Sequence, residues 1–232
     1  MISILCSNYN SDQYIDNYLH YLNNQLLLEF EVIFVDAKST DSSLTKIKEF
    51  KFRDGIKTKI IECPQRIPIY AAWNMGIEQS SYDYVMNYNT DDKLFKSSLL
   101  TLSTYLKTCS HADIIYSDVF LSEDPNHGST TGWYKWQDAN IKENLLAGCC
   151  VGPFPLLKKK SVIEAGMFDP SFSISGDYEM WCRMQSKGYK FLKIEEPLGV
   201  YYNNPSRIST AQNLERITEH FRQDGLIRST YA

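Results

Sequence analysis

The feature that most constrains the fold is an alternation of short apolar runs with segments whose apolar residues recur every three or four positions. The runs ISILC at 2–6 and EVIFV at 31–35 are typical of buried strands. The segment between them predicts a helix with one apolar face, made of Tyr14, Ile15, Tyr18, Leu19, Leu22 and Leu26. Strands and helices that alternate in this way predict an α/β fold with a mostly parallel sheet flanked by helices.

The same alternation continues along the chain. Further helices are expected near 42–51, 69–80, 96–107, 159–165, 176–187 and from about 211. Further strands are expected near 58–62, 82–88 and 113–120, with two short ones within 189–202. A segment rich in Trp and Tyr at 130–138 interrupts the alternation, and we expect a smaller mixed region after it. No linker or repeat divides the chain, so we expect a single domain over 1–232.

The composition excludes some classes of function. The 24 Lys and Arg residues against 28 Asp and Glu residues give a formal charge of -4, without the basic excess that nucleic-acid binding requires. The six cysteines never show the Cys-x-x-Cys spacing of zinc ribbons or thioredoxins, and we expect them to be reduced. The first residues lack the pattern of a signal peptide, so we expect a cytoplasmic protein whose contact with a membrane is at most peripheral.

Polar residues follow three of the predicted strands at the point where each strand ends. Asn8 and Asn10 follow the first strand, Asp36 ends the second, and Asp91 and Asp92 follow the strand at 82–88. In parallel α/β sheets, ligands bind beyond the carboxyl ends of the strands. These residues are therefore the first candidates for a binding site.

The adjacent carboxylates Asp91 and Asp92 suit a hard divalent cation. Mg²⁺ and Mn²⁺ take one or two protein carboxylates and complete their coordination with water and substrate phosphate oxygens. A solvated turn that caps the helix near 96 is the structural alternative. For Asp36 the binding interpretation is a hydrogen bond to a nucleoside, and the alternative is that Ser39 or Asp41 simply caps the next helix.

Several motifs in order carry a resemblance to a known family. The segments AAWNMGI, SSYDY and YNTDD lie within 71–92, ADIIYSDV follows at 112–119, and GMFDPSFSISGDYEMWCRMQSKGYKFLKI occupies 166–194. Together with the opening SILCSNYN and with VDAKSTD, they resemble the family 2 glycosyltransferases of the GT-A fold, in particular a bacterial polysaccharide-type branch. The resemblance covers about residues 2–205. It implies a Rossmann-like GT-A sheet with 1–120 as the nucleotide-sugar-binding half and 121–232 as the acceptor-binding half.

The resemblance also implies roles for individual residues. Asp36 would contact the nucleoside, Asp92 with help from Asp91 would hold Mn²⁺ or Mg²⁺ against the donor diphosphate, and Asp177 would be the catalytic base. Glu179 is the substitute for Asp177, and a helix cap is the structural alternative for Asp177 itself. The remaining candidates for donor binding are Asn8, Asn10, Lys38, Asn74 and Arg207.

Two positions depart from the family pattern. Ala37 and Lys38 stand where many members have a second Asp and a Gly, so Lys38 is a candidate for the diphosphate instead. Arg207, in NNPSRIS, could clamp the same phosphates, and a solvated surface arginine is the alternative. Trp133, Tyr134, Trp136 and Tyr178 could stack on sugar rings or pack in the core.

The resemblance implies an inverting, metal-dependent transferase that moves a sugar from a nucleotide-diphosphate donor to a glycan or lipid-linked saccharide in surface polysaccharide synthesis. A carboxylate opposite the leaving group would accept the proton of the attacking hydroxyl. The alternative, favoured by Ala37 and Lys38, is a non-catalytic module that binds a nucleotide sugar or a glycan. A nucleotidyltransferase would need a glycine-rich phosphate loop with a basic residue, and SNYNSDQ has neither.

Overall fold

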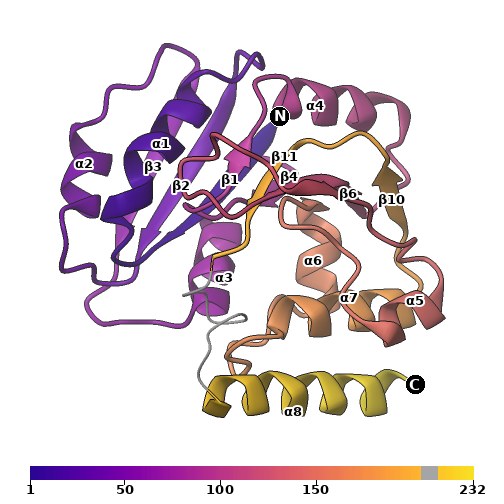
Figure 1. Ribbon diagram of the computed structural model, residues 1–232. Coiled ribbons are helices and arrows are strands. Elements are labelled where there is room, and N and C mark those ends of the chain that lie inside the picture. Colours follow the sequence, from indigo (N-terminus) through magenta and orange to yellow (C-terminus); the bar gives the residue numbers. More distant parts are fainter. Residues whose placement is uncertain (205–213) are drawn as a thin grey trace.

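The computed structural model describes residues 1–204 and 214–232 (Figure 1). Its helices are α1 (Asp12–Asn23), α2 (Ser43–Glu49), α3 (Ile69–Gln79), α4 (Ser98–Thr108), α5 (Lys142–Ala147), α6 (Lys159–Ala165), α7 (Gly176–Ser186) and α8 (Leu214–Tyr231). The strands of the larger sheet are β1 (Ile2–Asn8), β2 (Phe30–Asp36), β3 (Ile56–Glu62), β4 (Tyr84–Asn87), β6 (Ile114–Ser117), β9 (Leu156–Lys158) and β10 (Phe191–Ile194). The strands of the smaller sheet are β5 (Lys93–Leu94), β7 (Val119–Ser122), β8 (Gly132–Tyr134) and β11 (Gly199–Tyr202).

The larger sheet has the strand order β10-β6-β9-β4-β1-β2-β3. Strands β1, β2, β3 and β4 all run parallel to one another, and β6 is parallel to β10. Strand β9 lies between β4 and β6 and is antiparallel to both. The predicted α/β class with a mostly parallel sheet is therefore confirmed, and β9 is the strand that makes the sheet mixed.

Two apolar layers cover the two faces of this sheet. Successive side chains of a strand point to opposite faces, so Ile2 and Ile4 of β1 pack with α1 and α4, whereas Leu5 packs with α3 and α7. In Figure 1, α1 and α2 lie beside β1 to β3, and α6, α7 and α8 lie together in the other half of the molecule. The parallel pairing of β1 to β4 places the carboxyl ends of these strands at one edge of the sheet.

Two sequence predictions about elements were wrong. The run DIIYSDVF is not one strand, because the chain passes at the buried Asp118 from β6 in the larger sheet to β7 in the smaller sheet. The Asp118 carboxylate accepts the main-chain N–H of Trp136 at 3.0 Å and forms an ion pair with Lys193 at 3.1 Å. These contacts fix the passage of the chain from one sheet to the other. Leu26 does not extend the apolar face of α1; the helix ends at Asn23, and Leu26 is 54% exposed.

The two halves of the chain share one sheet. Strands β9 and β10 come from 121–232, yet they flank β6, which belongs to 1–120. The prediction that one half binds a donor and the other an acceptor stays a prediction. Within the described residues, none of the helices has the length and apolar character needed to span a bilayer.

Candidate active site

The carboxyl ends of β1 and β2 are joined by a buried polar cluster. Asn8 ends β1 and lies opposite Asp36, which ends β2. The Asn8 amide donates to Asp36 Oδ1 at 2.7 Å and to the hydroxyls of Ser39 and Ser43, both at 3.1 Å. Its carbonyl oxygen accepts from the Ser11 hydroxyl. Asn8 is fully buried, so its amide orders the loops of the site rather than facing a ligand.

The Asp36 carboxylate is also occupied by the protein. It is 1% exposed and accepts the Ser39 N–H at 3.0 Å and the Ser39 hydroxyl at 2.6 Å in addition to the Asn8 amide. Asn10 and Lys38 both adopt the left-handed conformation, with φ of 50° and 64°, and the Asn10 side chain accepts the Thr40 N–H at 2.8 Å. Asn10 lines the neighbouring cleft, whereas Lys38 points to solvent outside it. Asp36 therefore shapes the turn that presents Ala37 to the cleft.

A large open cleft of about 1990 Å³ lies at this edge of the sheet. Its walls come from distant parts of the chain: the turn at 9–11, the segment 66–70, the loop 89–91, the segment 170–177 and the first part of α8. Both apolar and polar side chains line it, including Tyr9, Arg66, Trp73 and Trp136. This combination of aromatic faces and a few polar groups is typical of a site for a sugar nucleotide or a similar ligand.

The two adjacent carboxylates after β4 have different environments. Asp91 lines the cleft, and its main-chain carbonyl is 3.0 Å from His127 Nε2. Asp92 is fully buried, and its Oδ1 accepts the Tyr202 N–H at 3.0 Å. The Tyr88 hydroxyl donates to the Asp92 carbonyl at 3.0 Å. Of this pair, Asp91 is the one that lines the cleft, and Asp92 ties the loop to β11; a metal at either one stays a prediction.

Asp177 also lines the cleft, from the first turn of α7. The Tyr70 hydroxyl lies 3.2 Å from Asp177 Oδ1 and also donates to the Ile174 carbonyl. Burial raises the pKa of Asp177, and the nearby charge of Asp224 adds to this, whereas hydrogen bonds from the Tyr178 N–H and from Tyr70 act in the opposite direction. A carboxylate with a raised pKa that faces a cleft is suited to accept a proton.

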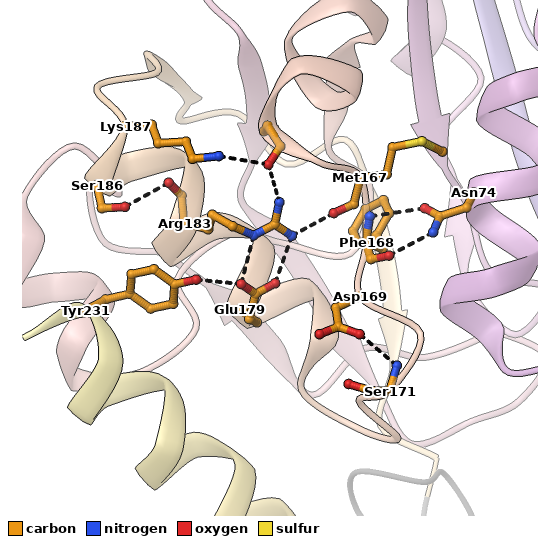
Figure 2. A network of polar contacts seen from close by, with 11 residues as sticks. Asn74, Met167, Phe168, Asp169, Ser171, Glu179, Arg183, Ser186, Lys187 and Tyr231 are labelled. Atoms are coloured by element: carbon orange, nitrogen blue, oxygen red, sulfur yellow. Dashed lines mark hydrogen bonds and ion pairs between the residues drawn. The ribbon is translucent and has the colours of Figure 1, made fainter.

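Glu179, the substitute candidate, is committed to a structural ion pair (Figure 2). Its two oxygens accept from Arg183 Nε at 2.8 Å and Nη2 at 2.9 Å, and the Tyr231 hydroxyl donates to Oε1 at 2.6 Å. Arg183 also donates to the carbonyls of Ala165 and Met167. This arrangement holds the loop after α6 against α7, so the geometry favours Asp177 over Glu179 as a base.

Asn74 holds the same loop from the side of α3. Its amide donates to the Phe168 carbonyl at 2.7 Å, and its side-chain oxygen accepts the Phe168 N–H at 3.0 Å (Figure 2). Such a pair of hydrogen bonds resembles the pairing of two β-strands and uses both the NH₂ group and the oxygen of the Asn74 amide. Asn74 is not among the described residues that line the cleft, and a contact of Asn74 with the donor stays a prediction.

Sequence reasoning missed several residues of the cleft. Arg66 stacks over the Tyr9 ring, with its guanidinium carbon 4.3 Å from the ring centroid. Tyr70 and Trp73 lie in the first half of α3 and also line the cleft. The position of Tyr9 between Asn8 and Asn10 at a strand end was a usable signal, whereas Arg66 lies in an irregular segment without one.

Other candidates divide between the cleft, the surface and the undescribed segment. Trp136 and Tyr178 line the cleft, and Trp133 and Tyr134 are exposed on β8. Arg207 lies outside the described residues. Within 1–204 and 214–232, no group of three or more His, Cys, Asp or Glu side chains converges as a ready-made metal site. The described cysteines are all free.

The family follows from a direct match. The model of glycosyl transferase family 2 matches residues 3–166, which include β1 and the loop with Asp91. The chain belongs to glycosyl transferase family 2. It is therefore a glycosyltransferase, and the predicted family is confirmed.

Relatives in this family carry names from polysaccharide synthesis. The amylovoran biosynthesis glycosyltransferase AmsB of Erwinia amylovora is 28% identical over 210 residues, which are 86% of this chain and 69% of AmsB. An archaeal relative from Methanococcus voltae, named dolichyl N-acetyl-alpha-D-glucosaminyl phosphate 3-beta-D-2,3-diacetamido-2,3-dideoxy-beta-D-glucuronosyltransferase, is 23% identical over 88% of this chain and 68% of its own length.

Solved structures share the fold of this family member at low sequence identity. The 1–349 fragment of Staphylococcus aureus TarS in complex with UDP-GlcNAc superposes with a TM-score of 0.77 at 15% identity, over 97% of this chain and 66% of that one. The mannosyltransferase PcManGT of Pyrobaculum calidifontis, in complex with GDP-Man and Mn²⁺, gives 0.68 at 13% identity, over 96% of this chain and 63% of that one. The chain thus has the predicted GT-A fold and spans about two thirds of these longer proteins.

Proposed function

We propose that this enzyme transfers one sugar, with inversion at the anomeric carbon, from a nucleotide-diphosphate donor to a hydroxyl of a glycan or lipid-linked saccharide. The observation that carries the proposal is that Asp91 and Asp177, 86 positions apart in sequence, line one and the same cleft. One carboxylate suits the phosphate end of a donor, and the other suits the attacking hydroxyl. The names of AmsB and of the archaeal relative support a saccharide acceptor.

The donor side of the cleft fits a divalent cation of the Mg²⁺ or Mn²⁺ type. Asp91 offers a hard oxygen ligand beside Asn89 and Thr90, which line the same wall. A single protein carboxylate is enough when the diphosphate and water complete the coordination, which agrees with the lack of a larger acidic cluster among the described residues. Such an ion, when bound, neutralises charge on the leaving diphosphate. We assign it to Asp91, with Asp92 holding the loop.

The acceptor side supplies the base. In the proposed step the acceptor oxygen bonds to the anomeric carbon, and the bond from that carbon to the phosphate oxygen breaks. The electron pair leaves with the nucleoside diphosphate, and the acceptor proton moves to Asp177. Because the attack comes from the face opposite the leaving group, the anomeric configuration inverts. Burial raises the pKa of Asp177 and makes its carboxylate a stronger proton acceptor than an ordinary aspartate.

The test compares Asp177→Asn with a matched control. UDP-GlcNAc and GDP-mannose, the donors in the TarS and PcManGT structures, are tried first with Mn²⁺ and candidate saccharide acceptors. Release of nucleoside diphosphate should fall about 10³-fold in Asp177→Asn, as expected for loss of a general base, while donor affinity stays near the wild-type value. Asp169→Asn alters an exposed carboxylate just before the segment 170–177 and should leave turnover unchanged.

Three results would contradict the proposal. Wild-type turnover in Asp177→Asn would remove the base, and metal-independent donor binding that is unaffected by Asp91→Ala would remove the cation. Retention rather than inversion in the product, read from the anomeric proton coupling by NMR, would exclude the one-step route. A cytoplasmic location and a peripheral contact with a membrane stay predictions.

A further inference from the structure

Tyr70 and Asp177 meet across 107 positions of sequence. Tyr70 lies in the first turn of α3 and is 3% exposed, so its hydroxyl is shielded from bulk water. That hydroxyl is within hydrogen-bond reach of two acceptors, the Ile174 carbonyl and Asp177 Oδ1. A phenol has one proton, so it can fully serve only one of the two acceptors at a time.

The Tyr70 ring is fixed against the start of α7. Gly176 is the first residue of α7, and a Cβ atom there would lie 2.7–2.9 Å from carbons of the Tyr70 ring. Glycine therefore lets the ring approach the backbone next to Asp177. The ring also stacks on Phe168, with centroids 6.0 Å apart, and meets the edge of Trp73 at 5.3 Å. These contacts leave the hydroxyl little freedom to move away from the carboxylate.

We infer that Tyr70 is the positioning residue of the base. Its hydroxyl donates a hydrogen bond to Asp177 while the carboxylate is ionised, and to the Ile174 carbonyl once Asp177 has taken a proton. The inference rests on the proposed role of Asp177. In the second state the protonated carboxyl donates to the Tyr70 oxygen, so Asp177 and the Tyr70 hydroxyl stay hydrogen-bonded to each other through the step. The exchange needs only a rotation of two hydroxyl groups and no movement of the backbone.

The charges around Asp177 make its hydrogen bond from Tyr70 important for the ionised form of the carboxylate. Asp224 of α8 faces the same region and disfavours the ionised form, and the Cys149 thiol lies nearby on the cleft wall without a permanent charge. The groups that favour the carboxylate are the main-chain N–H groups of Tyr178 and of Asp177 itself and the Tyr70 hydroxyl. Removing the Tyr70 hydroxyl therefore leaves the carboxylate with main-chain donors alone against burial and a neighbouring negative charge.

The test replaces Tyr70 by Phe, which keeps the ring contacts and removes the hydroxyl. We expect the pKa of Asp177 to rise by about one unit, the size of a net hydrogen bond to a charged group. The pKa is measured by ¹³C NMR of protein labelled in the aspartate carboxyl groups, with the Asp177 signal assigned by its loss in Asp177→Asn. Tyr18→Phe is the control, since the Tyr18 hydroxyl donates to the Tyr88 carbonyl in the other core layer.

A kinetic measurement complements the titration. The acid limb of the kcat/KM profile should move to higher pH in Tyr70→Phe by the same amount, and kcat above that limb should fall about tenfold while the donor KM changes little. A merely structural role of Tyr70 would not move the pH midpoint. Should Tyr70→Phe not fold, the wild-type protein still tests the inference, because the Tyr70 ¹³Cζ shift must follow the titration of Asp177.

The outcomes separate this inference from the proposed function. An unchanged Asp177 pKa in Tyr70→Phe, or a Tyr70 signal that ignores the Asp177 titration, would overturn the positioning role and leave Asp177 as the base. Full turnover in Asp177→Asn would instead overturn the proposed function, whatever Tyr70 does.

Discussion

Asp91 and Asp92 are neighbours in sequence, but their environments are opposite. Asp91 lines the cleft, and Asp92 is buried with its carboxylate bonded to the Tyr202 N–H. The two residues lie in a turn closed by a hydrogen bond from the Asp92 N–H to the Asn89 carbonyl at 3.3 Å, so an acidic pair after a strand can serve binding and folding at once. A pair of carboxylates in a sequence therefore does not imply two ligands to one ion.

Arg66 gives a prediction at the level of one side chain. Its guanidinium stacks on Tyr9 in the cleft, where a forked cation can bind a diphosphate or the edge of a nucleobase. We expect Arg66→Ala to weaken donor binding about tenfold, a loss of about 1.4 kcal/mol, by isothermal titration calorimetry. Lys38→Ala is the control because Lys38 is exposed outside the cleft. Equal weakening in both variants would contradict the assignment.

Among the larger elements, the loop between α6 and α7 depends on two clamps. Arg183 binds the carbonyls of Ala165 and Met167 from α7, and Asn74 binds Phe168 from α3. Met167 has a φ of 60°, a conformation that a side chain disfavours and that such contacts must maintain. The residues that follow, up to Asp177, form one wall of the cleft. The clamps thus connect the packing of helices to the shape of the site.

Breaking the Arg183 clamp should cost both stability and activity. Arg183 and Glu179 have side chains only 16% and 10% exposed, so Arg183→Met leaves a buried carboxylate without its cation. We expect a loss of about 3–5 kcal/mol in the free energy of unfolding by urea, with reduced turnover. Adding Glu179→Gln should recover part of the loss. Lys160→Ala removes a pair whose Lys side chain is 78% exposed, and it should change stability by less than about 0.5 kcal/mol.

The sequence predicted most elements but not the contacts between them. Strands and helices such as β2 and α3 were predictable because local periodicity determines them. The family motifs identified Asp177 as a candidate, yet the meeting of Tyr70 with Asp177 depends on packing across 107 positions. The orientation of Asp92 depends on β11, another distant element. The motifs that contain Asn8 and Asn74 are recognisable in the sequence, but their hydrogen-bond partners are not. The sequence therefore does not distinguish an amide that binds another part of the protein from an amide that binds a ligand.

At the scale of the whole molecule, both halves of the chain build one sheet and one cleft. Strand β9 joins β4 to β6, and α8 contributes its first turns to the cleft wall. Gln223 of α8 accepts the N–H groups of Ile174 and Ser175, both at 3.1 Å, just before the first turn of α7. The position of Asp177 is therefore a property of the assembled domain and not of one segment.

This coupling predicts how the stability of the whole fold varies with pH. Burial raises the pKa of Asp177 above its value in the unfolded chain, so between these two values the native state binds more protons. Stability therefore falls as pH rises through this window, and the loss is complete above the native pKa. Asp177→Asn cannot ionise and should unfold at a higher urea concentration than wild type at pH 7. The difference should vanish near pH 3, and a less stable variant at pH 7 would contradict this.

The bond between Asp92 and the Tyr202 N–H also sets what substitutions the two positions can accept. The carboxylate belongs to a side chain, whereas its partner is an amide that every residue except proline provides. The ring of Tyr202 packs beside Tyr14 and His127, so another large aromatic group can replace it. In a saturation library selected for folding, position 92 should keep Asp or Asn, and position 202 should vary among aromatic residues and lose proline. Substitutions near the mouth of the cleft should therefore be tolerated better on β11 than in the turn that contains Asp91 and Asp92.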